Sequence, residues 1–350
     1  MRAGRQQTPG LVVWPVMFTA FRPWVLGALI AALAGGGAAS AATYLINVEG
    51  PMDLATVTAA QTGDTVFRIS PSSGAVSVAS GAGRRISSGN ARSQVSITCR
   101  PSRGVDTTCQ TDNIAIRVSA IGFVSGRARA PTNFTVSMGT ATQVGPATGT
   151  NPLAFSIAPP GDNGTRTFFV GTDFGVAGDD SSLSSGAGEN NFVVAIVNPG
   201  GISISSDTDK GLVTVLRALA ITKTGDLSFG RIQLPTSGVS TISLDASTGT
   251  RTITGTAFGY PTPAPTRAAF NITGEGGQQV SLSVPASLTL SGPASLTVTL
   301  TSSASSAPTL AGTRGSGGAF AFTVGGRFDI SNTTPTGAYS GMLTVSVDYN

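Results

Sequence analysis

Two cysteines are the residues of this sequence whose type and spacing point most directly to a definite chemistry. Cys99 and Cys109 are separated by nine residues, and the 350-residue chain has no other cysteine. It also has no histidine, so two thiolates have no imidazole to complete a metal site. The Cys-x-x-Cys spacing of redox enzymes is absent as well. The pair therefore predicts one structural disulfide, in a protein exported to an oxidising compartment.

The remaining polar side chains do not form a catalytic set. Without histidine, a serine or cysteine nucleophile lacks its usual base, and the chain offers only Lys210 and Lys223 as lysine alternatives. Two carboxylates would serve a glycosidase, but most acidic residues stand in turn sequences such as Asp162-Asn-Gly. Asp179-Asp180 lacks the spaced ligands of a calcium loop. We expect no enzyme, no metal and no cofactor.

The first 42 residues have the sequence of a secretory signal peptide. They contain three arginines, no acidic residue, and an apolar run at 25–34 that is followed by small residues through Ala42. This order favours cleavage after Ala41 or Ala42. An uncleaved anchor is the alternative, but a membrane span needs about 20 apolar residues. We therefore expect an exported protein, in the periplasm, at the cell surface or outside the cell, with no membrane span after cleavage.

Cleavage would also change the charge and the aromatic content. The chain has 21 basic and 17 acidic residues, and loss of three arginines leaves 18 against 17, or +1. A nucleic-acid partner is therefore not expected. Trp14 and Trp24 would leave with the signal peptide. Because sugar-binding surfaces favour large aromatic faces, their loss weakens a glycan-binding role.

Alternating sequences indicate that the rest of the chain is all-β. In 341–350 the residues Leu343, Val345, Val347 and Tyr349 form one apolar face, as in a half-buried strand. No convincing amphipathic helix is found. Many short strands between small-residue turns predict a sandwich or a barrel. Similar alternating runs occur at 93–98, 113–118, 239–244, 279–284, 295–300 and 319–330.

The sequence also repeats itself weakly. Asp53-Leu54 matches Asp226-Leu227, 173 positions on, and Phe169-Val-Gly-Thr-Asp-Phe174 matches Thr323-Val-Gly-Gly-Arg-Phe328, 154 positions on. A third match joins 193–197 to 343–347 at an offset near 150. The shrinking offset predicts one duplicated unit, with about 19 extra residues in the first copy around the cysteine loop and 127–152.

These matches set the predicted domain boundaries. The polar stretch 199–211 is typical of a linker, with a long loop as the alternative. Units of this size are ordinary for sandwich domains. The predicted order is a signal peptide at 1–42, a first β-sandwich domain with the disulfide loop at 43–198, a linker at 199–211, and a second β-sandwich domain at 212–350.

Four ordered motifs in the second unit carry a family resemblance. They are Asp226-Leu-Ser-Phe-Gly-Arg-Ile232, Ala269-Phe-Asn-Ile-Thr-Gly-Glu275, Val324-Gly-Gly-Arg-Phe328 and the ending from Gly337 to Tyr349. The series resembles an uncharacterised family of secreted bacterial β-sandwich domains related to fimbrial subunits. The first unit resembles the family more weakly, because it lacks the Phe-Gly and the Gly-x-Tyr-Ser-Gly ending. The resemblance implies an all-β protein of two tandem immunoglobulin-like sandwiches used in surface assembly.

The resemblance gives the terminal strand a candidate role. Fimbrial subunits similar to this one end in an alternating strand with a penultimate aromatic residue, and Tyr349 occupies that place. A neighbour can extend such a strand by adding a strand of its own. We therefore predict an assembly strand formed by Leu343, Val345, Val347 and Tyr349. The alternative is that 341–350 is simply the last strand of a complete sandwich.

The sequence thus predicts an exported, fimbria-like structural subunit that assembles by β-strand addition. The partners implied are copies of itself, other surface subunits and a periplasmic chaperone. The alternative function is a two-domain surface adhesin, whose first domain binds a ligand and whose second domain anchors it.

Overall fold

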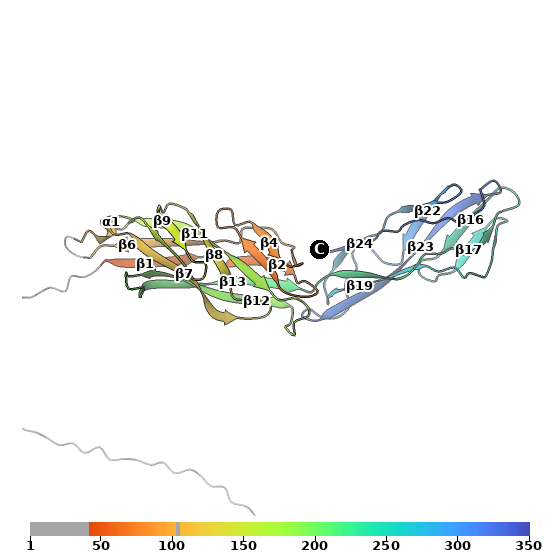
Figure 1. Cartoon of the computed structure of the whole chain (residues 1–350). Helices are drawn as coiled ribbons and strands as arrows, with labels where there is room; N and C mark the ends of the chain where they lie inside the picture. The colour runs from red at the N-terminus through yellow and green to blue at the C-terminus, as the bar shows by residue number, and fades with distance from the viewer. Residues whose placement is uncertain (1–41, 103–105) are drawn as a thin grey trace, which may run out of the picture. The chain divides into compact units, whose positions relative to one another are not determined.

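The computed structural model describes residues 42–102 and 106–350, and almost all of its regular structure is β-strand (Figure 1). The all-β class predicted from the sequence is confirmed. The predicted signal peptide, 1–42, lies outside the described residues except for Ala42. Within the described part of the chain, no helix is long and apolar enough to cross a membrane.

The first sandwich consists of two sheets that share one apolar core. One sheet has the order β1-β6-β11-β3-β4, with β8 also paired to β11, and the other has the order β5-β2-β13-β12-β7-β10-β9. The elements are β1 (Thr43–Glu49), β2 (Met52–Thr58), β3 (Thr65–Ile69), β4 (Val76–Ser80), β5 (Arg84–Arg85), β6 (Ser93–Arg100), α1 (Thr108–Thr111), β7 (Ile114–Val124), β8 (Thr132–Met138), β9 (Gln143–Thr148), β10 (Leu153–Ile157), β11 (Thr165–Val176), β12 (Gly186–Val197) and β13 (Ser203–Leu216).

The second sandwich has a separate core. Its larger sheet has the order β14-β19-β23-β16-β17, with β22 paired to β23 and β21 to β22. Two further sheets contain two strands each, β15 with β18 and β20 with β24. The strands are β14 (Ala220–Gly225), β15 (Ile232–Gln233), β16 (Val239–Leu244), β17 (Arg251–Thr254), β18 (Phe258–Gly259), β19 (Ala268–Glu275), β20 (Val280–Ser283), β21 (Ser287–Ser291), β22 (Ser295–Ser302), β23 (Gly317–Ser331) and β24 (Ser346–Tyr349).

The strands form where the sequence alternates. In β6 the inward residues Val95, Ile97 and Cys99 are buried, and the residues between them are half-buried. Period-two burial of this kind places one face of each sheet on the core. The six alternating runs predicted before 341–350 all lie in strands, which agree with them to within a few residues at most ends. At β7 and β23 the strands run further than the alternation showed.

Residues 199–211, predicted as a linker, are not one. β13 starts at Ser203, pairs with β12 in antiparallel fashion along most of its length and pairs with β2 in parallel fashion from Gly211 to Leu216. The stretch is polar because the amino-terminal half of β13 is largely exposed, whereas Val213 and Val215 are buried in the first core. The first core therefore extends past the boundary at 198 that the sequence suggested.

The predicted repeat has a structural counterpart. The sheet order β1-β6-β11-β3-β4 recurs as β14-β19-β23-β16-β17, and β22 lies beside β23 as β8 lies beside β11. Phe174 of β11 pairs with Phe67, and Phe328 of β23, 154 positions on, pairs with Ile242. Phe67 and Ile242 are 175 positions apart, so the offset shrinks along the chain as predicted.

The glycine shared by both copies has a steric role. A Cβ on Gly171 would overlap the carbonyl oxygen of Ile69, and a Cβ on Gly325 would overlap that of Leu244. Gly171 and Gly325 are 154 positions apart, and Ile69 and Leu244 are 175 apart. The same backbone approach is therefore made twice, which explains why the repeat retains Val-Gly at this point.

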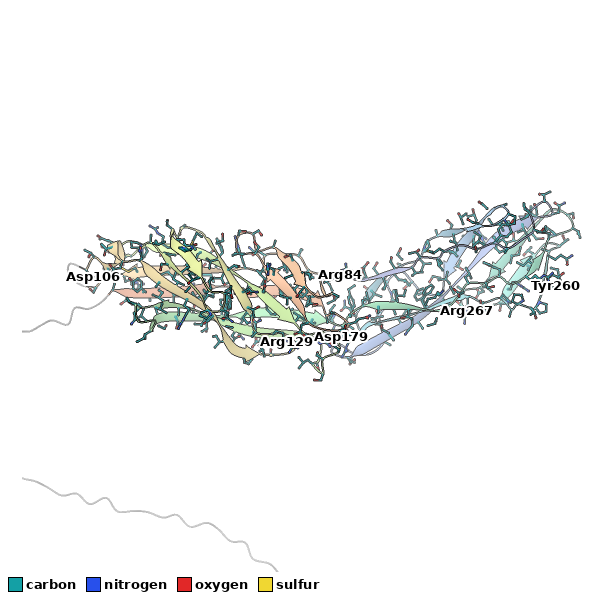
Figure 2. All side chains as sticks on the ribbon, viewed as in Figure 1. Arg84, Asp106, Arg129, Asp179, Tyr260 and Arg267 are labelled. Atoms are coloured by element: carbon teal, nitrogen blue, oxygen red, sulfur yellow. A yellow bond between two sulfur atoms is a disulfide. The ribbon has the colours of Figure 1, made fainter. Side chains whose placement is uncertain are left out.

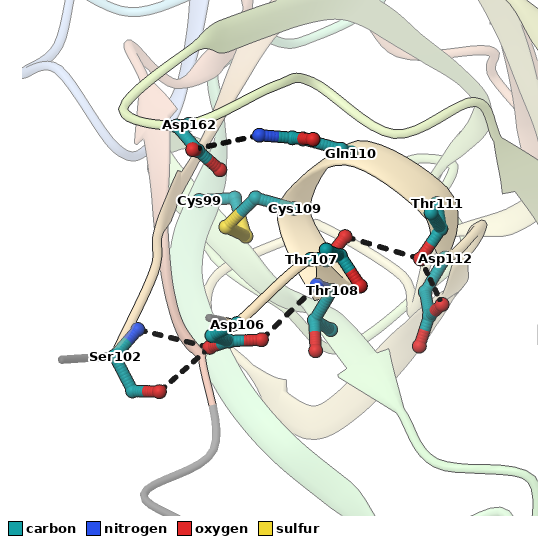
Figure 3. The surroundings of a disulfide bond; sticks show 10 residues. All are labelled: Cys99, Ser102, Asp106, Thr107, Thr108, Cys109, Gln110, Thr111, Asp112 and Asp162. Carbon is teal, nitrogen blue, oxygen red and sulfur yellow. Dashed lines mark hydrogen bonds between the residues drawn. A yellow bond between two sulfur atoms is a disulfide. The ribbon is translucent and has the colours of Figure 1, made fainter. Parts of the chain in front are cut away.

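The disulfide joins β6 to α1 in the first sandwich (Figure 3). The Cα atoms of Cys99 and Cys109 are 5.6 Å apart, and both residues are fully buried. Beside them, Asp106 accepts hydrogen bonds from the Thr108 amide and from the amide and hydroxyl of Ser102. Hydrogen bonds from Thr108 and Ser102 hold the pKa of the Asp106 carboxyl well below its usual range. The disulfide predicted from the sequence is present.

Removing the disulfide should destabilise the first sandwich alone. Closing a loop of this size should contribute about 2–3 kcal/mol by restricting the unfolded chain, so the Cys99→Ala/Cys109→Ala variant should lose that much. Hydrogen exchange read by mass spectrometry should show faster exchange in 42–216 and unchanged protection in 219–350. Equal loss of protection in both sandwiches would contradict a local role, and two free thiols by intact mass in the exported protein would refute the bond.

Candidate functional site: a groove in the second sandwich

The second sandwich has a groove of about 1130 Å³ with large apolar side chains at its base. One wall is the segment 226–234, and the other is the segment 334–343. Between the walls lie large apolar side chains from the sheets beneath. These are Phe270, Leu288, Leu290, Leu296, Phe328 and Ile330.

The groove lies where the first sandwich has a strand. There, β13 lies between β2 and β12 and joins them into one seven-stranded sheet. The β2–β5 pair corresponds to β15–β18: Thr58 pairs with Arg84, and Gln233 with Phe258, at offsets of 175 and 174. In the second sandwich, no strand of the described residues lies between β15 and β24. The layer is therefore split into two two-stranded sheets.

The other wall corresponds to β12. Ile196 of β12 pairs with Ile116, and Val347 of β24 pairs with Leu282. Counted in register from this match, Phe192 corresponds to Leu343, 151 positions on. At this offset of 151, the inward-facing residues of β12 correspond to the inward-facing residues of 343–347. The sequence alone had suggested an offset near 150.

The four residues of the predicted assembly strand lie on one face. Leu343, Val345, Val347 and Tyr349 are half-buried and pack against the second core. The regular strand is shorter than predicted: β24 covers 346–349 and pairs with β20, whereas Ser340 forms a single bridge to Ser291. Leu343 lines the groove. A role of this row in assembly stays a prediction.

Tyr349 closes one end of the second core. Its hydroxyl accepts a hydrogen bond from the Glu275 amide (2.7 Å) and donates one to the Arg217 carbonyl oxygen (2.9 Å). The neighbouring Gly274 leaves room for it, because a Cβ there would overlap the phenol oxygen. Gly274 is 175 positions beyond Cys99, so the tyrosine takes the place that the disulfide has in the first sandwich. Burial raises the pKa of Tyr349 to about 12.

The mouth of the groove is polar and aromatic. Lys223 pairs with Asp226 at 2.6 Å. The Arg231 guanidinium lies over the ring of Tyr260, 4.9 Å from its centre. Tyr260 is labelled in Figure 2. Phe258 packs edge-on against the same ring. A polar rim around an apolar floor suits an extended segment with alternating side chains.

The other candidate residues take structural roles. Asp179 forms an ion pair with the fully buried Arg127, and Asp180 accepts the Gly63 amide hydrogen. Among the described residues, no group of three His, Cys, Asp or Glu side chains could hold a metal ion. Cys99 and Cys109 lie in the first sandwich and do not line the groove.

The family described as "Domain of unknown function (DUF4402)" matches residues 219–349, which are the residues of the second sandwich. No curated protein matches the chain. The resemblance to a domain family of unknown function, drawn from the four motifs, therefore has support in the region where those motifs lie.

Two solved structures are similar at low levels. A chain of the chaperone–tip adhesion subunit complex from archaic chaperone-usher Csu pili of Acinetobacter baumannii is 10% identical, with a TM-score of 0.26, covering 86% of this chain and 100% of that one. A chain of a chaperone–tip adhesin complex of CFA/I fimbriae is 10% identical, with a TM-score of 0.23, covering 86% and 97%. At these values the likenesses carry no argument about function.

The hydroxyl of Tyr349 should contribute to the stability of the second sandwich. Tyr349→Phe keeps the ring but loses both hydrogen bonds, so the free energy of unfolding should fall by about 1–2 kcal/mol at neutral pH. Because the folded pKa of about 12 exceeds the value near 10 of an exposed tyrosine, ionisation favours the unfolded chain. The wild type should therefore lose stability as the pH rises from about 10 to 12.

Denaturant unfolding followed by circular dichroism across this pH range would measure both effects. Tyr260→Phe, which removes an exposed hydrogen bond to Gln233, is the matched control. The difference between wild type and Tyr349→Phe should shrink above pH 10. A constant difference up to pH 12, or none at neutral pH, would contradict the role given to this hydroxyl.

Proposed function

We propose that the protein is an exported, fimbria-like surface subunit whose second sandwich is completed by a β-strand from another protein molecule. The observation that supports this is the apolar groove at the place where β13 completes the first sandwich. The order β1-β6-β11-β3-β4 of the first copy recurs as β14-β19-β23-β16-β17 in the second, so the first copy is a guide to what the second one accepts.

Two physical needs favour a strand as the occupant. The groove leaves apolar side chains such as Leu288, Leu290 and Leu296 only half-buried, and covering them is favourable at about 25 cal/mol per Å². The strands on either side of the gap also have free edges: β15 pairs only with β18 and β24 only with β20, so each has one edge without a strand partner among the described residues. An added strand satisfies both needs at once, through backbone hydrogen bonds and alternate side chains.

The first sandwich also gives the direction of that strand. β13 is antiparallel to β12 and parallel to β2. The added strand would accordingly run antiparallel to β24 and parallel to 226–233. Its inward side chains would pack on the floor of the groove, as Val213 and Val215 of β13 pack on the first core.

The partners follow from the same groove. Copies of this protein or other surface subunits would supply the strand in the assembled state. A subunit with an open apolar groove is prone to aggregate during export. A periplasmic chaperone that covers the groove before assembly is therefore part of the proposal.

The adhesin reading is compatible with this role. The first sandwich has the strand that the second lacks, so its sheets need no partner strand at that position. It is thus free for a different task, such as binding a ligand at the surface. In this arrangement the second sandwich attaches the protein to the surface assembly, and the first sandwich binds the ligand.

A graft tests the proposal. A copy of residues 199–216 appended after Asn350 should reach the groove of its own chain, because the same segment follows β12 in the first sandwich. Burial of two or three apolar side chains should raise the melting temperature of the second sandwich by about 5–15 °C. It should also abolish polymers and surface display, since the groove is then filled within the molecule.

The matched control is the same graft with Val213→Asp and Val215→Asp in the appended copy. This control has the same length and loop but cannot cover the apolar floor. Scanning calorimetry and the amount of surface-exposed protein per cell are the measurements. Equal melting temperatures for the two grafts, or normal surface display of the unmodified graft, would sink strand addition at this groove.

A further inference from the structure

One position of β13 admits no side chain in the first sandwich. A Cβ on Gly211 would lie 2.7 Å from a ring carbon of Phe174 and would overlap the side-chain oxygen of Asn190. Gly211 is buried, and its neighbours in the sheets are Met52 and Asn190. The tight fit therefore comes from the side chains around it.

The corresponding place on the groove wall carries no side chain. Asn190 precedes Phe192 by two residues, and the residue two before Leu343 is Gly341. Gly341 lines the groove and must be small, because a Cβ on it would overlap the carbonyl oxygen of Thr289 and would lie close to Leu288 and Leu290. The side-chain amide of Asn190, which excludes a side chain at Gly211, therefore has no equivalent in the groove.

The other neighbours of this position also have counterparts. That of Phe174 is Phe328, 154 positions on, and its ring packs edge-on against Phe229, with 4.8 Å between ring centres. At the offset of 175 found for β2 and β15, Met52 corresponds to Leu227, which lines the groove. The groove at this point is consequently an apolar site bounded by Phe328, Leu288 and Leu290.

We infer that the strand completing the second sandwich carries a large apolar side chain where β13 carries Gly211. The inference rests on the proposed function and adds the chemistry of the partner strand. A glycine at this position would leave the site unfilled, and unfilled apolar cavities are costly. The β13 sequence can occupy the groove but leaves this one site unfilled, so a strand with a large apolar residue there should bind more tightly than β13 does.

Peptide binding to the purified full-length exported protein tests this. The parent peptide has the sequence of residues 207–216, with a fluorophore at its amino end, and variants carry Gly211→Ala, Gly211→Leu or Gly211→Phe. Fluorescence anisotropy should give a Kd at least about tenfold lower for the Leu peptide than for the parent, because a Leu side chain is newly buried. The Ala peptide should fall between them.

Two controls distinguish binding at this specific site from nonspecific hydrophobic binding of the peptide. A Thr214→Leu peptide carries the added side chain at the position that is exposed in β13, and it should gain far less. In the protein, Leu288→Phe enlarges a side chain that bounds the site. It should reduce the advantage of the Leu peptide several-fold and leave binding of the parent peptide nearly unchanged, which also reports that the variant is folded.

The outcomes distinguish this inference from the proposed function. Equal binding of the Gly and Leu peptides, or an equal gain from Thr214→Leu, would overturn the inference and leave strand addition intact. Binding of none of the peptides would count against both. The graft result then stands as the independent measure of the proposed function, because it does not depend on affinity in solution.

Discussion

A β-sandwich must cover both faces of its core and pair the edges of its strands. This requirement determines how both sandwiches of the molecule are built. In the first sandwich that need is met within the described chain, because β13 enters between β2 and β12. In the second, the counterpart of the six-stranded sheet is present, yet the facing layer stops on either side of a gap. The floor of the gap is the core itself, so whatever fills it becomes part of the fold.

The same constraint is visible at the end of each core, where the two copies use different chemistry. In the first, a covalent link between β6 and α1 encloses the loop that follows the strand. In the second, Gly274 stands at the matching place and the hydroxyl of Tyr349 bonds to backbone on both sides. The phenol thereby fixes the end of β24 and holds one side of the groove in register. A terminal aromatic residue is thus a structural anchor here, whatever further part it has in assembly.

How much of this was predictable varies with the kind of signal. Strands such as β16 and β22 alternate clearly, and the sequence located them nearly to the residue. The disulfide followed from the number of cysteines and the absence of histidine. β13 was missed because Ser205, Asp207 and Asp209 occupy its half-buried positions, so its first half lacks the apolar face that marks a strand. The sequence repeat ends with the match of 193–197 to 343–347, before β13 begins, so it gave no signal for this strand.

The groove itself could not be read from local sequence, because none of its residues is unusual alone. Leu290 and Leu296 are residues of the kind that form a core, and in a closed sandwich they would be buried. They are half-buried because no strand of the described residues covers them, which is a property of topology. The groove can be interpreted because the sandwich is duplicated: the layer is closed by β13 in one copy and open in the other. Differences between the copies at single positions, such as Asn190 against Gly341, then carry information about the missing strand. Gly341 brings no side chain to this wall, because its backbone lies close to the Thr289 carbonyl, and the apolar site beside Leu288 and Leu290 is left for a side chain of the occupant.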